Sequence, residues 1–261
     1  MPYIEAQDCK LHYTIDDHTD PWNKPDSVLF VHGFTENTEA WRQWVPHFSR
    51  QYRVVRIDQR GFGKSGAVPK DYRLTTDLYV DDLVKVITEV CGGRAHVVGG
   101  KSGGISVMSL AAARPDVVQT ITAICSPVTP PAAEGWLDEM DRDGIRSWAK
   151  RTQRSRMGSQ MPDAGIEWWS DLMGTTPLAT AHAYLRWVSA IDIREDIKRI
   201  RCPTLVIGTD TERRGREVFE GWAKTIPNAE LKMIPVDGYH AAATDADQTA
   251  GVVREFIDRH R

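Results

Sequence analysis

The sequence predicts an α/β protein whose central sheet is mostly parallel and flanked by helices. Short apolar runs with the length of buried strands alternate with amphipathic helical segments along most of the chain. A helical, tryptophan-rich stretch from about residue 132 to 193 interrupts this alternation and has no strand signal. Because strands resume after it, we expect a helical cap inserted between two strands of the sheet.

The individual elements follow from apolar runs that end at polar or glycine residues. The strands expected before the cap are 11–15, 28–31, 53–57, a run ending near Val98, and 118–125, with helices over 40–49, 75–90 and 105–113. After the cap we expect strands over 203–207 and 231–235, a helix near 217–225, and a final helix that carries Val252, Val253, Phe256 and Ile257. The chain then divides into a first part of the core (1–127), the cap (128–196) and a second part of the core (197–261).

Composition excludes several classes of function. The chain has 33 Lys and Arg against 36 Asp and Glu, so its net charge of −3 does not favour nucleic acid as a partner. Its four cysteines are far apart and form no Cys-x-x-Cys pair, which argues against a disulfide framework and a zinc site. No apolar stretch has the length of a membrane span or a leader segment, so we expect a soluble, cytoplasmic protein with no membrane partner. The oligomeric state is not predicted.

A Gly-x-Ser-x-Gly motif, Gly100 to Gly104, lies between an apolar run and a helical segment. A serine on such a strand-to-helix turn is exposed as a nucleophile, which makes Ser102 the candidate. The same turn places the Gly103 N–H where an oxyanion would form. His32-Gly33 ends the strand at 28–31, and the next residue, Phe34, offers a second N–H.

The remaining triad members are expected on loops after later strands. His240 follows the last strand on a glycine-containing loop, and its imidazole can take the serine proton and return it to a leaving group. Two acids, Asp210 and Glu212, follow the strand at 203–207. We favour Asp210 because it is shorter and nearer the strand end, and Glu212 is the alternative.

Cofactor and metal motifs are absent from the sequence. Gly63-Lys64-Ser65 and Gly100-Lys101-Ser102 resemble the end of a phosphate-binding loop, but the glycine that such a loop needs is replaced by Asp58 and Ala95. No metal-binding His-Glu-x-x-His motif or dinucleotide fingerprint is present. We therefore expect no cofactor and no metal.

Taken together, these motifs resemble the α/β-hydrolase fold family. The matching segments are 31–34, 58–65, 100–104, the acid after the strand at 203–207, and 238–240. The resemblance implies the α/β-hydrolase fold, with Ser102 as nucleophile, His240 as base, Asp210 as orienting acid, and the N–H groups of Phe34 and Gly103 as oxyanion hole. There are two departures: Lys101 is an unusual residue before the nucleophile, and Thr211 stands where the family's aspartate falls.

The compact size and the helical lid look similar to the enol-lactonase, carbon-carbon bond hydrolase and small carboxylesterase branches of that family. We expect a serine hydrolase that cleaves a small carboxylic ester or lactone, a small-molecule carbonyl substrate, through an acyl-enzyme. One alternative is cleavage of a carbon-carbon bond in a vinylogous diketone acid, and another is a triad-retaining receptor or binding protein with little turnover. Candidate substrate contacts are Lys101, Trp136 and the cap arginines Arg146, Arg151, Arg154 and Arg186.

Overall fold

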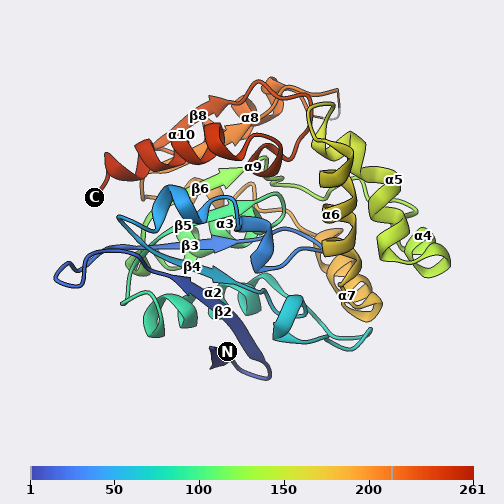
Figure 1. Cartoon of the computed structure of the whole chain (residues 1–261), viewed down its shortest axis with the longest axis horizontal. Helices are drawn as coiled ribbons and strands as arrows, with labels where there is room; N and C mark the ends of the chain where they lie inside the picture. The colour runs from blue at the N-terminus through green and yellow to red at the C-terminus, as the bar shows by residue number, and fades with distance from the viewer. Residues whose placement is uncertain (1, 213) are drawn as a thin grey trace.

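The computed structural model describes residues 2–212 and 214–261, and its centre is an eight-stranded sheet (Figure 1). The strands are β1 (Tyr3–Glu5), β2 (Lys10–Asp16), β3 (Ser27–Val31), β4 (Arg53–Ile57), β5 (Ala95–Gly100), β6 (Val118–Ile124), β7 (Thr204–Gly208) and β8 (Ala229–Met233). Their order in the sheet is β1-β2-β4-β3-β5-β6-β7-β8; β2 is antiparallel to both its neighbours, and all other pairs are parallel. This confirms the predicted α/β class with a mostly parallel sheet.

The central strands are buried on both faces, which is why they read as continuous apolar runs in the sequence. Every residue of β3 and β5 is buried. The last strand begins and ends two residues before the predicted 231–235, and Pro235, which has no N–H to donate, lies outside the ladder. The short antiparallel β1 was missed because its three residues offer too short a pattern.

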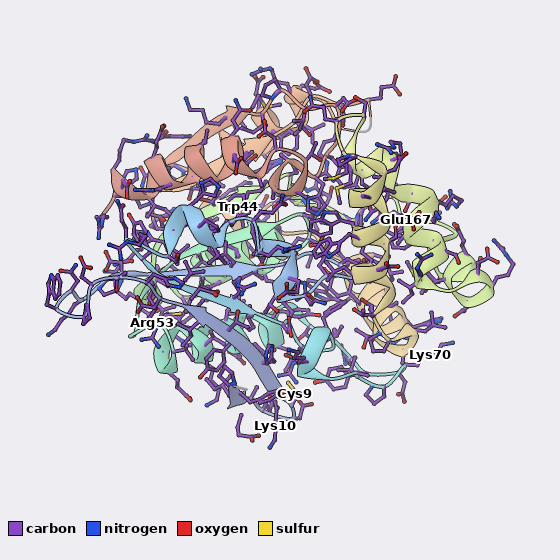
Figure 2. All side chains as sticks on the ribbon, in the orientation of Figure 1. Cys9, Lys10, Trp44, Arg53, Lys70 and Glu167 are labelled. Atoms are coloured by element: carbon purple, nitrogen blue, oxygen red, sulfur yellow. The ribbon has the colours of Figure 1, made fainter. Side chains whose placement is uncertain are left out.

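Helices cover the two faces of the sheet. The helices of the core are α1 (Val45–Phe48), α2 (Thr76–Glu89), α3 (Gly103–Ala113), α8 (Arg216–Ala223), α9 (Ala241–Thr244) and α10 (Ala246–Asp258). One core cluster joins the sheet to α2, α3 and α8, and a second joins it to α1 and α10. Trp44, labelled in Figure 2, is fully buried in the second cluster, and its indole N–H donates to the Ala242 carbonyl at 2.8 Å.

The predicted helix over 40–49 is divided in the structure. A 3₁₀ helix covers Thr38–Trp41, and α1 begins separately at Val45. Pro46 lies in the first turn of α1, where its missing N–H costs nothing, so it starts a new helix and does not continue the earlier one.

Four helices lie in the chain between β6 and β7, within the segment 128–196 that we call the cap. They are α4 (Trp136–Asp143), α5 (Ile145–Met157), α6 (Asp163–Gly174) and α7 (Leu178–Val188), and they stand together at one end of the sheet (Figure 1). The ring of Tyr184 on α7 stacks on Phe34 of the core, with centroids 4.8 Å apart. Among the helices of the described residues, none has both the length and the apolar character needed to cross a bilayer.

Candidate active site

The turn between β5 and α3 lies at the expected site, and Lys101 forms it. The backbone of Lys101 has φ of 51°, a left-handed conformation that costs energy for a residue with a side chain. Ser102 has φ of −70° and ψ of −16°, so it is already helical. The strained position from which a nucleophile projects in such a turn therefore holds Lys101, one residue before the predicted serine.

The close contacts of the glycines around the turn also indicate that Lys101 occupies the nucleophile position. Two frames overlap in the sequence, one centred on Lys101 with Gly99 and Gly103, the other centred on Ser102 with Gly100 and Gly104. A Cβ on Gly99 would lie 2.7 Å from the Gly104 Cα, and a Cβ on Gly103 would lie 2.3 Å from the His32 carbonyl oxygen. A Cβ on Gly100 would only come within 3.3 Å of a tryptophan ring. The first frame is therefore the one in which both small residues meet backbone that cannot move aside.

Ser102 consequently occupies a different place from the one predicted. Its Oγ accepts a hydrogen bond from the Phe34 N–H at 3.0 Å and also interacts with the Tyr184 hydroxyl. Within the described chain, neither imidazole nitrogen of His240 forms a hydrogen bond with it. A serine hydroxyl without an adjacent base keeps its ordinary, weak nucleophilicity. The structure thus corrects the predicted Ser102–His240 pairing.

The predicted acids are also elsewhere. The Asp210 carboxylate accepts the backbone N–H of Arg216 at 3.3 Å, at the start of α8, and Glu212 is exposed on the same loop. Thr211 pairs with Arg214 in a tight turn, which directs this loop towards α8. Neither acid bonds to His240 in the described structure, so the prediction that one of them orients that imidazole is corrected.

The acid that pairs with His240 in the structure is Glu36. The His240 Nε2 lies 2.7 Å from Glu36 Oε1, and the Lys101 ammonium pairs with the same oxygen. The backbone N–H of Gly33 donates to the other oxygen of Glu36 at 2.9 Å. We call Lys101, Glu36 and His240 the elbow cluster; their side chains are 13%, 3% and 5% exposed, so it is shielded from solvent.

The buried surroundings shift the pKa values of Glu36 and His240 in the elbow cluster. Burial alone would raise the pKa of Glu36, but the Lys101 ammonium and the hydrogen bonds from its partners hold that pKa well below its ordinary value. Burial and the nearby Lys101 charge lower the pKa of His240. An ionised Glu36 beside a neutral imidazole requires His240 to donate from Nε2, which leaves Nδ1 unprotonated; that atom is buried and has no hydrogen-bond partner in the described structure.

Sequence reasoning missed Glu36, although two signals pointed to it. The expected acid position after β7 is occupied by Thr211, so an acid had to come from another segment. Glu36 follows Gly33 by three residues on the loop after β3, the spacing at which a carboxylate can accept that glycine's N–H.

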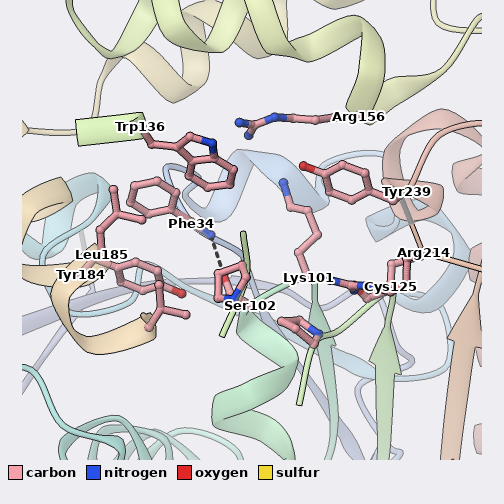
Figure 3. A pocket seen from close by; sticks show the side chains of 13 residues that line it. Phe34, Lys101, Ser102, Cys125, Trp136, Arg156, Tyr184, Leu185, Arg214 and Tyr239 are labelled. Carbon is pink, nitrogen blue, oxygen red and sulfur yellow. Dashed lines mark hydrogen bonds between the residues drawn. The ribbon is translucent and has the colours of Figure 1, made fainter. Parts of the chain in front are cut away.

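A pocket lies directly over the turn (Figure 3), with a cavity of about 80 Å³. Its described lining is mostly apolar and aromatic, with a few polar groups: Phe34, Lys101, Ser102, Cys125, Pro127, Pro131, Trp136, Arg156, Tyr184, Leu185, Val188, Arg214 and Tyr239. The predicted contacts Lys101 and Trp136 are among them. The site therefore combines a small apolar chamber with charged groups at the elbow.

The predicted cap arginines do not line this pocket. Arg186 lies on α7 and donates to the Lys70 carbonyl oxygen. Arg146, Arg151 and Arg154 are exposed and form ion pairs with neighbouring acids. The arginines that line the pocket are Arg156 and Arg214, which were not singled out because neither lies in a recognisable motif.

Sequence comparison places the chain among known proteins. The family described as alpha/beta hydrolase fold matches residues 26–160, just over half of the chain. A putative non-heme chloroperoxidase of Synechocystis is 25% identical, covering 98% of this chain and 100% of that protein. The probable lysophospholipase BODYGUARD 4 of Arabidopsis thaliana is 30% identical over 51% of this chain, and the match spans only 33% of that protein.

Solved structures agree on the fold. The enol-lactonase from Burkholderia xenovorans LB400 superposes with a TM-score of 0.89 at 19% identity, covering 98% of this chain and all of that one. The esterase RhEst1 from Rhodococcus superposes with a TM-score of 0.85 at 17% identity, covering 99% of this chain and 98% of that chain. The sheet order, the strand-to-helix turn and the family match lead to one conclusion: the chain belongs to the alpha/beta hydrolase fold family.

Proposed function

We propose that the chain hydrolyses a small carboxylic ester or lactone whose carbonyl group binds above the elbow. The observation that carries the proposal is the Phe34 N–H, which points at an acceptor oxygen on the floor of the pocket, here Ser102 Oγ. A substrate carbonyl oxygen can take that donor by displacing the hydroxyl. In the Lys101-centred frame the second donor is the N–H of the next residue, Ser102, in place of the predicted Gly103.

Lys101 supplies the positive charge for this reaction. Its side chain lines the pocket and is held by Glu36, so the ammonium lies close to the charge that develops on the carbonyl oxygen. Water adds to the carbonyl carbon, and the bond to the leaving alkoxide breaks. The Lys101 ammonium donates a proton to the alkoxide and recovers one from the attacking water, so the lysine is unchanged at the end of the cycle.

Glu36 and His240 act through Lys101. The ionised Glu36 orients the ammonium, and its bonds from Gly33 and His240 fix the carboxylate in one geometry. In this arrangement His240 is a positioning residue, which differs from the predicted role of general base to a serine. The mechanism proceeds without an acyl-enzyme on Ser102.

A binding protein with little turnover is the second candidate. It is favoured by one observation: the described structure gives Ser102 no basic partner. A pocket of this kind can hold a ligand without cleaving it, because fold alone does not set a rate.

Paired variants at adjacent positions test the mechanism. We expect Lys101→Met to lower kcat on p-nitrophenyl acetate and small lactones by about 100-fold, the size of one lost transition-state donor. Ser102→Ala should stay within about fivefold of the wild type, since the hydroxyl is displaced on binding. Lys85→Met, at a partly exposed position of α2 outside the pocket, is the matched control for loss of a lysine charge. Circular dichroism checks that each variant is folded.

Mass spectrometry after treatment with a fluorophosphonate separates the alternatives. The proposal expects no adduct on Ser102. An adduct on Ser102 together with an inactive Ser102→Ala variant would restore the serine mechanism. No turnover of any ester, lactone or diketone acid by folded protein would leave the binding protein as the function.

A further inference from the structure

The charges that line the pocket all have one sign. Three of the described lining residues are cationic, Lys101, Arg156 and Arg214, and none is an aspartate or glutamate. Glu36 lies behind Lys101 and is outside this lining. Since the rest of the lining is largely apolar, the cations act in a medium of low dielectric, where an anionic ligand is attracted more strongly than in water.

Arg156 lies over two aromatic rings. Its guanidinium carbon lies 4.1 Å from the ring centroid of Trp148 and 5.5 Å from that of Trp136, and the residue is only 4% exposed. A guanidinium carries its N–H donors in a planar fork that matches a carboxylate. The two rings thus hold a group of this chemistry at the wall of the pocket.

The backbone ties Arg156 to the elbow cluster. Its carbonyl oxygen accepts the backbone N–H of His240 at 3.0 Å, and a Cβ on Gly238 would lie 2.5 Å from that same oxygen. The end of α5 therefore lies against the loop that carries His240. Figure 3 shows Arg156 and Trp136 across the cavity from Ser102, with the Lys101 side chain extending between them.

Arg214 contributes from the neighbouring wall. Its Nη1 donates to the Cys125 carbonyl oxygen at 2.8 Å, at the end of β6. This bond keeps a second guanidinium beside the turn that carries Lys101. Both arginines thus line the same small chamber as Lys101 and Ser102.

We propose that this pocket selects carbonyl compounds that also carry a carboxylate, with the carbonyl at Phe34 and Ser102 and the carboxylate at Arg156. The inference rests on the proposed function for the placement of the carbonyl. A short acid that has both groups within one small chamber suits this lining, such as the half-ester of a small dicarboxylic acid or a lactone acid. Arg214 and Lys101 add to the positive potential that attracts it.

Ligands without a scissile bond test the binding step separately from catalysis. Isothermal titration calorimetry compares the keto acids pyruvate, levulinate and 5-oxohexanoate with their primary amides, which keep the shape and lose the charge. We expect at least one keto acid to bind at least tenfold more tightly than its amide. Arg156→Gln should remove that difference, and Arg156→Lys should restore only part of it because the fork is lost.

Arg151→Gln is the matched control, since Arg151 is on the same helix, is exposed, and pairs with Glu139. It should leave the acid-to-amide ratio unchanged. Equal affinity for acids and amides, or no binding of any keto acid by the wild type, would overturn the inference, and so would an equal effect of both arginine variants.

Hydrolysis of a half-ester and of the matching diester tests the same preference for a carboxylate during turnover. Monomethyl glutarate should be cleaved with at least tenfold higher kcat/KM than dimethyl glutarate, and Arg156→Gln should act mainly on KM for the half-ester. Ester cleavage with no preference for the acid would contradict this inference and leave the proposed function intact. Tight binding of keto acids without ester cleavage would contradict the proposed function alone.

Discussion

The Glu36 carboxylate is buried, and three donors on three separate segments approach it. Lys101 comes from the turn after β5, His240 from the loop before α9, and the Gly33 N–H from its own loop after β3. A buried charge is tolerated only when its partners are in place, and removing one member of such a set leaves the others uncompensated. The charge of Glu36 is therefore compensated only when these three segments of the chain are folded together.

Replacing Glu36 by Gln should lower the free energy of unfolding by about 3 kcal/mol at pH 7, because Lys101 keeps a buried charge without its counter-ion. The folded-state pKa of Glu36 lies well below its ordinary value of 4.5, so unfolded chains bind this proton first as pH falls. The stability that the carboxylate contributes is present above pH 4.5 and is lost as pH falls below it. The gap between wild type and variant in urea denaturation should therefore narrow from pH 7 to pH 3.5.

Glu39→Gln is the control for that comparison, because Glu39 is 54% exposed and its ion pair with an arginine is long, at 3.7 Å. Its effect should stay below about 1 kcal/mol, as for other exposed ion pairs. A gap between wild type and the Glu36 variant that does not change with pH would mean that folding does not lower the pKa of this carboxyl.

At the scale of elements, the turn between β5 and α3 positions the site. Gly103 starts α3 directly under the loop after β3, where a side chain would meet the His32 and Val31 carbonyl oxygens at 2.3 and 2.5 Å. Gly100 ends β5 and faces only the edge of the Trp41 ring, at 3.3 Å. Gly103 of the Lys101-centred frame and Gly100 of the predicted Ser102-centred frame thus have different steric requirements.

A comparison of Gly103→Ala with Gly100→Ala checks the register of the turn. Gly103→Ala should cost about 3 kcal/mol of unfolding free energy, because its Cβ would clash with the backbone of both Val31 and His32. Gly100→Ala should change it by less than about 1 kcal/mol, since the aromatic ring can give by a few tenths of an ångström. Urea denaturation measures both, and equal costs would argue against the Lys101-centred frame.

These glycines also explain how far the sequence predicts this protein. The strands and most helices were predictable because burial on both faces leaves a continuous apolar run, as in β3. The position of the turn was predictable to within one residue. The sequence contains two overlapping Gly-x-x-x-Gly frames, and the sequence pattern alone does not decide which of them flanks the nucleophile position. The two sequence signals at Glu36 do not by themselves assign its role, because that role depends on three segments that meet only in the folded chain.

At the scale of the whole molecule, the cap meets the core along two lines. On one line, Val68 donates to Thr180 of α7, and Tyr184 stacks on Phe34. On the other, the end of α5 meets the histidine loop, and the Ser159 N–H donates to Asp237. The helix α4 lies outside both lines, packed on α5 and α7, and yet it carries the pocket-lining Trp136.

From this arrangement we expect α4 to be the part of the cap that moves to open the pocket. It is bounded by Gly135 and Gly144, whose φ values of 73° and 81° are left-handed, and neither glycine has another atom close to where a Cβ would lie. Its hydrogen bond to α7 joins Asp141 to His182 Nε2 at 2.6 Å. Displacement of α4 would move one wall of the pocket and leave the core contacts of α5 and α7 in place.

Asp141→Asn should therefore open α4 more often without unfolding the protein. We expect amide hydrogen exchange over residues 136–143 to rise roughly fivefold, in keeping with the loss of a charge-assisted hydrogen bond at a half-exposed site. Exchange over 145–157 should not change, because α5 keeps its contacts with α6 and the histidine loop. Asp138→Asn removes the same charge from an exposed position of α4 and should have no effect. Faster exchange throughout the cap would show instead that α4 to α7 open as one unit, which would assign substrate entry to the whole cap.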